Sequence, residues 1–287
     1  MTTPKLTLSA PPQGAAQRHS GGHSGGRAGA AAASITLTST PAVQYLLRIG
    51  DTCLVLGQRL GEWCGHGPVL EEDIALTNVA LDLIGQTRAL LSHAARLDGQ
   101  GFDEDQLAFL RDERDYRNFS IAELPRGDFA FTVLRNLMLA TWLKLLWDKL
   151  QDSTDNELAG IAGKAIKEAR YHQQHAADWV LRLAGGTDES RRRTEAALAE
   201  LWRYVPEMFA ADAVDEAAAA AGLGPSRSAL QEPWLAEMAA VFDEAGLVPP
   251  ADSSFRSSGS TGVHTEHMGF LLADLQILQR SFPGGVW

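Results

Sequence analysis

Compact active-site motifs are scarce in this 287-residue sequence. It contains neither the loop Gly-x-x-x-x-Gly-Lys-Ser/Thr that holds phosphates nor the Gly-x-Gly-x-x-Gly turn that binds dinucleotides. Cysteine is scarce as well. Cys53 and Cys64 lie eleven residues apart, a helical rise of roughly 16 Å, which is too far for a disulfide. We therefore expect two reduced, buried thiols and no structural zinc site.

Basic residues are in the minority, because 25 Lys and Arg stand against 36 Asp and Glu and the formal net charge is −11. A surface this acidic repels phosphate backbones, which argues against nucleic-acid binding. Coenzyme A thioesters are also polyanions, so any such ligand would need a local basic patch.

Long uninterrupted apolar runs are lacking too. The longest run, residues 129–147, contains Arg135 and Lys144, so it predicts a buried helix rather than a membrane span. The N-terminus has no compact apolar segment of the kind that signal peptides carry. We expect a cytoplasmic protein that does not enter a membrane.

Period-two alternation of β-branched residues is also missing, and helical periodicity takes its place. The first predicted helix begins at Pro41, carries one apolar stripe and ends near residue 61. A second follows Pro68, with acids in its first turn, and ends at Gly99. A third starts at an Asp128 cap and runs to about residue 151. A fourth starts at a capping box of Thr154 and Glu157 and ends near residue 185. Shorter helices are predicted at about 189–204, 228–245 and 264–281.

This order of helices predicts an all-α protein with a ferritin-like four-helix bundle and additional C-terminal helices. The connection 99–127 is the long crossover that ferritin-like bundles place between their second and third helices. Residues 1–36 hold no acidic residue and little apolar periodicity, so we expect a disordered tail there. Residues 37–287 then form one helical domain.

Ferritin-like di-iron proteins ligate their metals with Glu and Glu-x-x-His on facing helices, because that spacing puts both ligands on one helix face. None of the eight histidines here has Asp or Glu three residues before it. The near-misses have the wrong spacing, since His172 follows Glu168 by four residues and Gln86 follows Asp82 by four. We therefore assign no catalytic residue and no metal ligand to this chain.

The polar residues at these positions predict a vestigial metal-site face, on which side chains satisfy one another where iron once bound. A Lys or Arg would replace the lost iron charge, because a buried carboxylate without a cation is costly. The residues of this face are Glu62, Asp82, Gln86, Lys164, Glu168, His172 and His175. Two alternatives stay open: a self-sufficient di-iron or manganese oxygenase with irregular ligand spacing, and an unrelated helical binding module.

Several segments closely resemble one known family, the C subunits of bacterial ring 1,2-phenylacetyl-coenzyme A epoxidases. The likeness extends from about residue 43 to 287, and its most specific segments are 54–66, 82–86, 111–114, 164–172 and 264–267. The resemblance implies a ferritin-like structural subunit of a phenylacetyl-CoA monooxygenase in aerobic phenylacetate degradation. It implies no cofactor in this chain itself.

The same resemblance implies the partners. They are the catalytic A subunit, which is similar in fold and holds di-iron, the small bridging B subunit, and a reductase that carries FAD and iron–sulfur and draws electrons from NADPH. The helix predicted at 129–151 has apolar residues on nearly every side. A four-helix bundle buries one stripe per helix, so part of this surplus must face the added C-terminal helices or another chain. The resemblance favours another chain for some of it.

Overall fold

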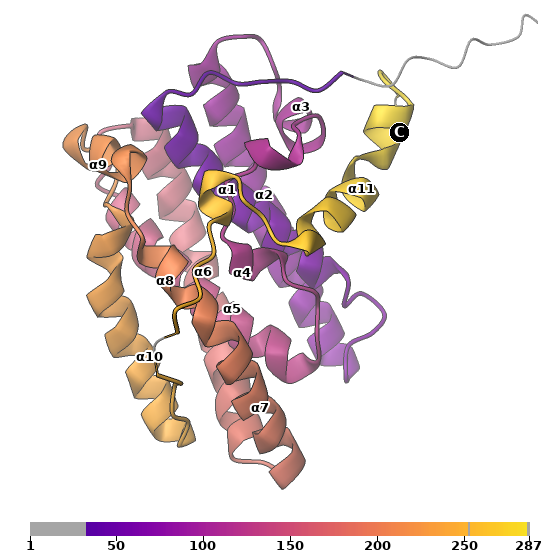
Figure 1. The fold of residues 1–287 in the computed structure, drawn as a ribbon, viewed down its shortest axis with the longest axis vertical. Coiled ribbons are helices and arrows are strands. Elements are labelled where there is room, and N and C mark those ends of the chain that lie inside the picture. The colour runs from indigo at the N-terminus through magenta and orange to yellow at the C-terminus, as the bar shows by residue number, and fades with distance from the viewer. Residues whose placement is uncertain (1–32, 252, 286–287) are drawn as a thin grey trace, which may run out of the picture.

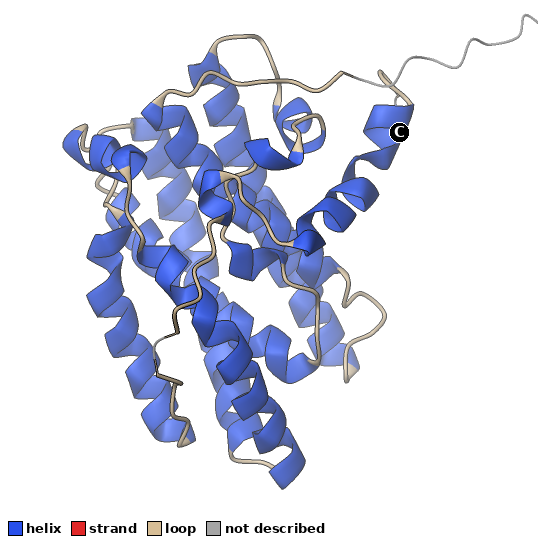
Figure 2. Ribbon diagram, viewed as in Figure 1, coloured by secondary structure: helices blue, strands red, loops and turns tan. Residues whose placement is uncertain are grey.

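The computed structural model describes residues 33–251 and 253–285, and within them it contains helices and no strand (Figure 2). Four long helices form the bundle (Figure 1): α1 (Pro41–Gly61), α2 (Leu70–Asp98), α5 (Phe129–Leu150) and α6 (Asn156–Ala184). The all-α, ferritin-like prediction is confirmed. The start and end predicted for α1, α2 and α5 agree with the structure to within about two residues.

Short helices fill the rest of the described chain. The crossover between α2 and α5 is not a plain loop, as it contains α3 (Glu104–Phe109), the 3₁₀ turn η1 (Glu113–Asp115) and α4 (Ser120–Glu123). After α6 come α7 (Asp188–Leu201), η2 (Trp202–Tyr204), α8 (Val205–Phe209), α9 (Ala213–Ala220), η3 (Arg227–Leu230), α10 (Gln231–Ala245), η4 (Gly259–Thr261) and α11 (Glu266–Ser281). In Figure 1, α11 lies at the edge of the molecule, against α3 and α4.

The bundle has two inner helices, α1 and α5. Helix α1 packs against α2 on one side and against α4 and α9 on the other. Helix α5 packs against α6, and α7, α10 and α4 cover its remaining sides. Helices α2 and α6 also pack against each other and form the outer layer of the bundle. The C-terminal helices therefore cover one side of the bundle, and the α2–α6 layer closes the other.

Helix α5 corrects one expectation about partner surfaces. By length and composition it is the one helix in the described residues that could cross a membrane, but 83% of its most apolar window is buried inside this chain. Trp142 and Trp147 are 1% and 0% exposed. The apolar surplus of α5 is thus covered by this chain's own helices, and the expectation that some of it faces another chain is wrong.

The charges inside the apolar run of α5 have specific partners. Arg135 is fully buried and donates from Nη1 to the carbonyl oxygen of Leu124 at 2.6 Å. Burial lowers the pKa of Arg135 to about 9. Lys144 forms an ion pair with Glu237 of α10, which ties that helix to α5. These two cations join the bundle to its covering segments.

Helix α1 also differs from the prediction of a single apolar stripe, because it is buried on almost all sides. Its buried side chains include Arg48, which pairs with Asp215 of α9 at 2.9 Å, and Asp51. Asp51 is fully buried and accepts from Arg111 Nη1 at 2.9 Å and from the backbone N–H of Arg117 at 2.8 Å. Arg111, which is 1% exposed, thereby fixes the crossover on α1.

Two local predictions also need correction. Helix α6 is capped by Asp155, not Thr154, because Thr154 is hydrogen bonded to the end of α9 through Ala221 and Gly222. Cys64 is exposed, since α1 ends at Gly61, before it; Cys53 is buried, as expected.

Most of the predicted tail lies outside the described residues. Its last residues do not match the expectation of disorder, because the backbone N–H of Ile35 donates to Leu110 at 3.0 Å and its side chain packs on the core. The division at residue 36 otherwise stays a prediction.

The buried pair of Arg111 and Asp51 gives a test of how the crossover is held. We expect Arg111→Ala to lower the free energy of unfolding by about 3–5 kcal/mol, because Asp51 is left as a buried, unpaired carboxylate. Arg88→Ala is the matched control, since Arg88 is 69% exposed and its pair with Glu104 contributes about 1 kcal/mol or less. Urea denaturation compares the two, and equal losses would contradict the role given to Arg111.

Candidate functional site

The candidate site is the seam between α2 and α6, where the two long helices run antiparallel and their polar side chains meet. Asp82 Oδ2 lies 2.9 Å from His172 Nε2, and Glu72 Oε2 lies 2.9 Å from His175 Nε2. Further along, Gln86 Nε2 donates to Glu168 Oε2 at 3.0 Å. As residue numbers rise along α2 they fall along α6. Asp82 and Gln86 lie one turn apart on α2, as do their partners His172 and Glu168 on α6, whereas Glu72 lies ten residues before Asp82.

The seam continues to the far end of both helices. His93 of α2 lies 2.6 Å from Asp155, the N-cap residue of α6, and Arg96 pairs with Glu157. Asp155 also accepts from the backbone N–H groups of Glu157 and Leu158. The same carboxylate therefore caps α6 and ties its start to α2.

The seam reaches the bundle centre at Gln86. Its Oε1 lies 3.6 Å from the Cys53 Sγ of α1, so three helices meet in a chain of Cys53, Gln86 and Glu168. Burial raises the pKa of the Cys53 thiol far above its ordinary value, which keeps it protonated. Neutral groups thus occupy two of the three positions in this chain.

Little space remains beside His172 and His175. A cavity of about 10 Å³ is lined by Leu56, Leu83, Asn136 and His172, among others, which is roughly the room that one water needs. Among the described residues, no cluster of three or more His, Cys, Asp or Glu could hold a metal ion. The donor set does not fit a di-iron centre, which needs several carboxylates and two imidazoles around one space.

Five of the seven residues predicted for the vestigial face are in the seam: Asp82, Gln86, Glu168, His172 and His175. The other two are elsewhere. Glu62 follows the end of α1 and pairs with Arg59 at 2.6 Å. Lys164 is exposed and forms no ion pair in the described part of the chain, so it does not neutralise Glu168.

Sequence reasoning missed two partners. The acids at the start of α2 are expected to interact with the helix dipole, but the side chain of Glu72 bonds His175. The second is the buried pair of Glu123 and His264, whose Oε2 and Nδ1 are 3.2 Å apart. Burial alone would lower the pKa of His264, yet the hydrogen bond and charge of Glu123 raise it. This pair holds the segment before α11 on α4, and nothing in the sequence spacing indicated it.

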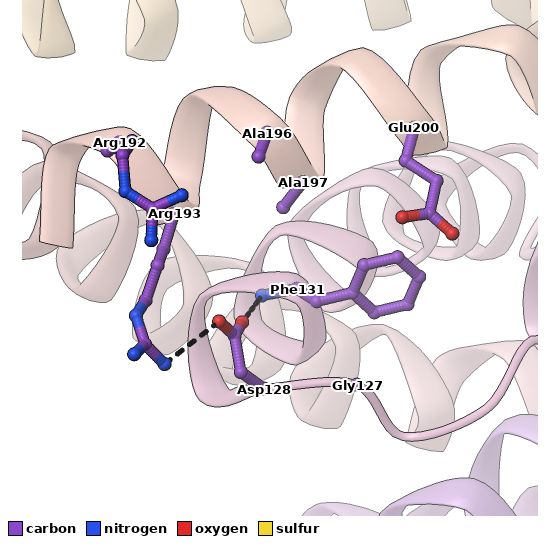
Figure 3. Close-up of a pocket in the computed structure, with 8 residues that line it drawn as sticks. All are labelled: Gly127, Asp128, Phe131, Arg192, Arg193, Ala196, Ala197 and Glu200. Atoms are coloured by element: carbon purple, nitrogen blue, oxygen red, sulfur yellow. Dashed lines mark hydrogen bonds and ion pairs between the residues drawn. The ribbon is translucent and has the colours of Figure 1, made fainter. Parts of the chain in front are cut away.

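A second depression, of about 300 Å³, lies between the start of α5 and α7 (Figure 3). Arg192 and Arg193 approach it, but both guanidinium groups are hydrogen bonded to Glu189. The hydrogen bond from Arg192, followed by that from Arg193, lowers the pKa of Glu189 to about 2. Arg193 also lies 3.4 Å from Asp128, the cap of α5. Because these cations already have carboxylate partners, the depression is a poor anion site.

The fold and the seam together define the class: a ferritin-like bundle whose centre is filled by hydrogen-bonded side chains. The model of the phenylacetic acid catabolic protein family matches residues 26–287. The C subunit of 1,2-phenylacetyl-CoA epoxidase from Escherichia coli (strain K12) is 48% identical over 243 residues, covering 85% of this chain and 98% of that protein. The chain belongs to the phenylacetic acid catabolic protein family.

The titration of His172 gives a pH test of the seam. Burial lowers the pKa of His172, although Asp82 acts in the opposite direction. The unfolded chain, with a histidine pKa of about 6.5, therefore binds more protons than the folded chain just below that pH. We expect the free energy of unfolding to fall as the pH drops below about 6.5, and His172→Gln to flatten this slope.

Urea titrations at several pH values measure the slope. His66→Gln is the control, because His66 is exposed and lies outside the seam. The interpretation fails if the His172 variant keeps the full acid slope of the unmodified chain.

Substitutions of Glu168 test whether its hydrogen bond to Gln86 stabilises the fold. Glu168→Ala leaves the Gln86 amide, which is 4% exposed, without its acceptor, and we expect a loss of about 1–3 kcal/mol. Glu168→Gln keeps an acceptor oxygen and should cost about 1 kcal/mol or less. Thermal melts compare the two variants, and identical losses would show that the hydrogen bond to Gln86 does not matter.

Proposed function

We propose that this chain is the non-catalytic, ferritin-like subunit of a phenylacetyl-CoA epoxidase complex. Its partner is the di-iron A subunit, which epoxidises the aromatic ring of phenylacetyl-CoA with O₂. The small bridging B subunit and a reductase with FAD and iron–sulfur, supplied with electrons by NADPH, complete the cytoplasmic complex. The relationship to the C subunit of the E. coli epoxidase supports this proposal.

One observation about the seam carries the non-catalytic part of the proposal. The positions at the bundle centre hold Cys53, Gln86 and Glu168, which are bonded to one another. Cys53 is kept neutral by burial and Gln86 is a neutral amide, so two of these three groups lack the anionic oxygen that ferrous ions prefer. We interpret Asp82, Gln86, Glu168, His172 and His175 as the vestigial face.

The alternative of a self-sufficient oxygenase needs Glu62, Asp82, Glu168 and His172 around one metal centre. Glu62 instead pairs with Arg59 beyond the end of α1, and Asp82 is bonded to His172. Without Glu62, the remaining candidate ligands contain too few carboxylates for two iron ions. A scaffold that holds the helices of a catalytic partner fits these contacts better.

Co-expression with the di-iron A subunit tests the proposal. We expect a stable complex in which iron follows the A subunit, and an isolated chain that binds no stoichiometric iron after anaerobic loading. Glu168→Gln should leave turnover of the reconstituted complex unchanged within about twofold, since a non-ligand contributes nothing to chemistry. Size exclusion, metal analysis and epoxidation assays provide the readouts.

Two results would contradict the proposal. About two irons bound per isolated chain would favour the self-sufficient oxygenase. Failure to co-purify with any other component of the epoxidase would favour an unrelated binding module.

A further inference from the structure

Helix α2 exposes an apolar row on its outer side. Leu70, Ile74 and Leu81 are 72%, 52% and 60% exposed, and their spacing of four and seven residues places them on one side of the helix. Gly85 continues this row, and a Cβ there would meet no atom within 4 Å. Three large exposed apolar side chains in register are unlike the scattered single ones that ordinary surfaces carry.

Helix α6 extends this apolar row sideways. The bond between Asp82 and His172 sets the register, so that Tyr171 lies across from Leu81. Tyr171 is 54% exposed, and its ring lies 6.2 Å from that of His172 and 6.0 Å from that of His175. The apolar surface therefore lies directly over the seam and spans both helices.

The basic end of this surface is formed by α6. Lys164 lies three residues before Lys167, and Lys167 lies four residues before Tyr171, so all three are on the same outward side. Both lysines are exposed, and neither forms an ion pair within the described residues. The exposed acid Glu71 lies at the opposite end of this surface, next to Leu70, so the lysines form a separate basic end. On a chain with a net charge of −11, this basic end favours a partner that carries carboxylates.

Helix α11 also exposes apolar side chains, but it contains no lysine. Phe270 and Ile277 are 73% and 58% exposed, but the exposed acids Glu266 and Asp274 lie on the same helix. A carboxylate-bearing partner would be repelled there.

We propose that the outer face of α2 and α6, formed by Leu70, Ile74, Leu81, Tyr171, Lys164 and Lys167, docks the di-iron A subunit of the proposed complex. That subunit presents an apolar helical surface bordered by carboxylates. This inference rests on the proposed function and adds to it the surface that contacts the partner. The seam beneath the face then has a second role, because it holds α2 and α6 in the register that the partner contacts.

The test uses full-length chains co-expressed with the di-iron A subunit. Ile74→Lys combined with Leu81→Lys puts two charges into the apolar row, and we expect the affinity for the A subunit to fall at least about tenfold. Phe270→Lys combined with Ile277→Lys is the matched control on α11, and its affinity should stay within about twofold. Lys164→Glu combined with Lys167→Glu should weaken binding and reduce its salt dependence.

Melting curves first confirm that each variant folds, which is expected because all substituted side chains are at least half exposed or on the surface. The inference is overturned if the α2 variant still binds the A subunit, if only the α11 variant loses it, or if the α2 variant merely dissociates a homodimer. If the unmodified chain does not bind the A subunit, the proposed function itself fails. If it binds through another face, the proposed function stands and only this inference is lost.

Discussion

Burial of α1 and α5 on nearly all sides is the constraint around which this structure is organised. A helix that is apolar all round must be covered on every side, and one partner helix covers only a stripe. Here α2 and α6 cover one side, while α4, α7, α9 and α10 cover the other. The helices that follow α6 cover the inner pair on one side of the bundle. The layer of α2 and α6 is therefore the large outer surface of the bundle that this chain does not cover.

Polar groups join the two sides to the inner helices in different ways. On the covered side, buried ion pairs such as Arg48 with Asp215 and Arg111 with Asp51 attach short segments to α1. Such pairs stabilise little in net terms but cost much when broken, so they fix where each segment lies. On the outer side, the contacts of the seam are mostly neutral or shared with histidine, and they set the register of α2 against α6.

The long helices and their ends could be predicted from the sequence because their signals are local. The Asp128 cap, the acids at the start of α2 and Gly99 after its end each act within one helical turn. The predicted cap of α6 is wrong by one residue because Thr154 is bonded to α9, about 70 residues away in the chain. The short helices of the crossover are not among the predicted helices. Helix α4 has no side-chain cap and is held by contacts with α1, α5 and α11. Helix α3 does carry a local signal, the capping box of Asp103 and Gln106, but it is too short for an apolar period to show.

The sequence by itself determined the fold class and the lack of any acid three residues before a histidine, since composition and spacing are properties of the chain alone. Tertiary structure decided which candidate residues meet. In the folded chain, Glu168 is hydrogen bonded to Gln86, which in turn contacts Cys53. Glu62 forms an ion pair with Arg59, and Lys164 is exposed. The tertiary structure also turned the apolar surplus of α5 inward and left that of α2 outward. The reason is physical: which face of a helix is buried depends on the helices packed around it, and those packing partners lie far away in the sequence.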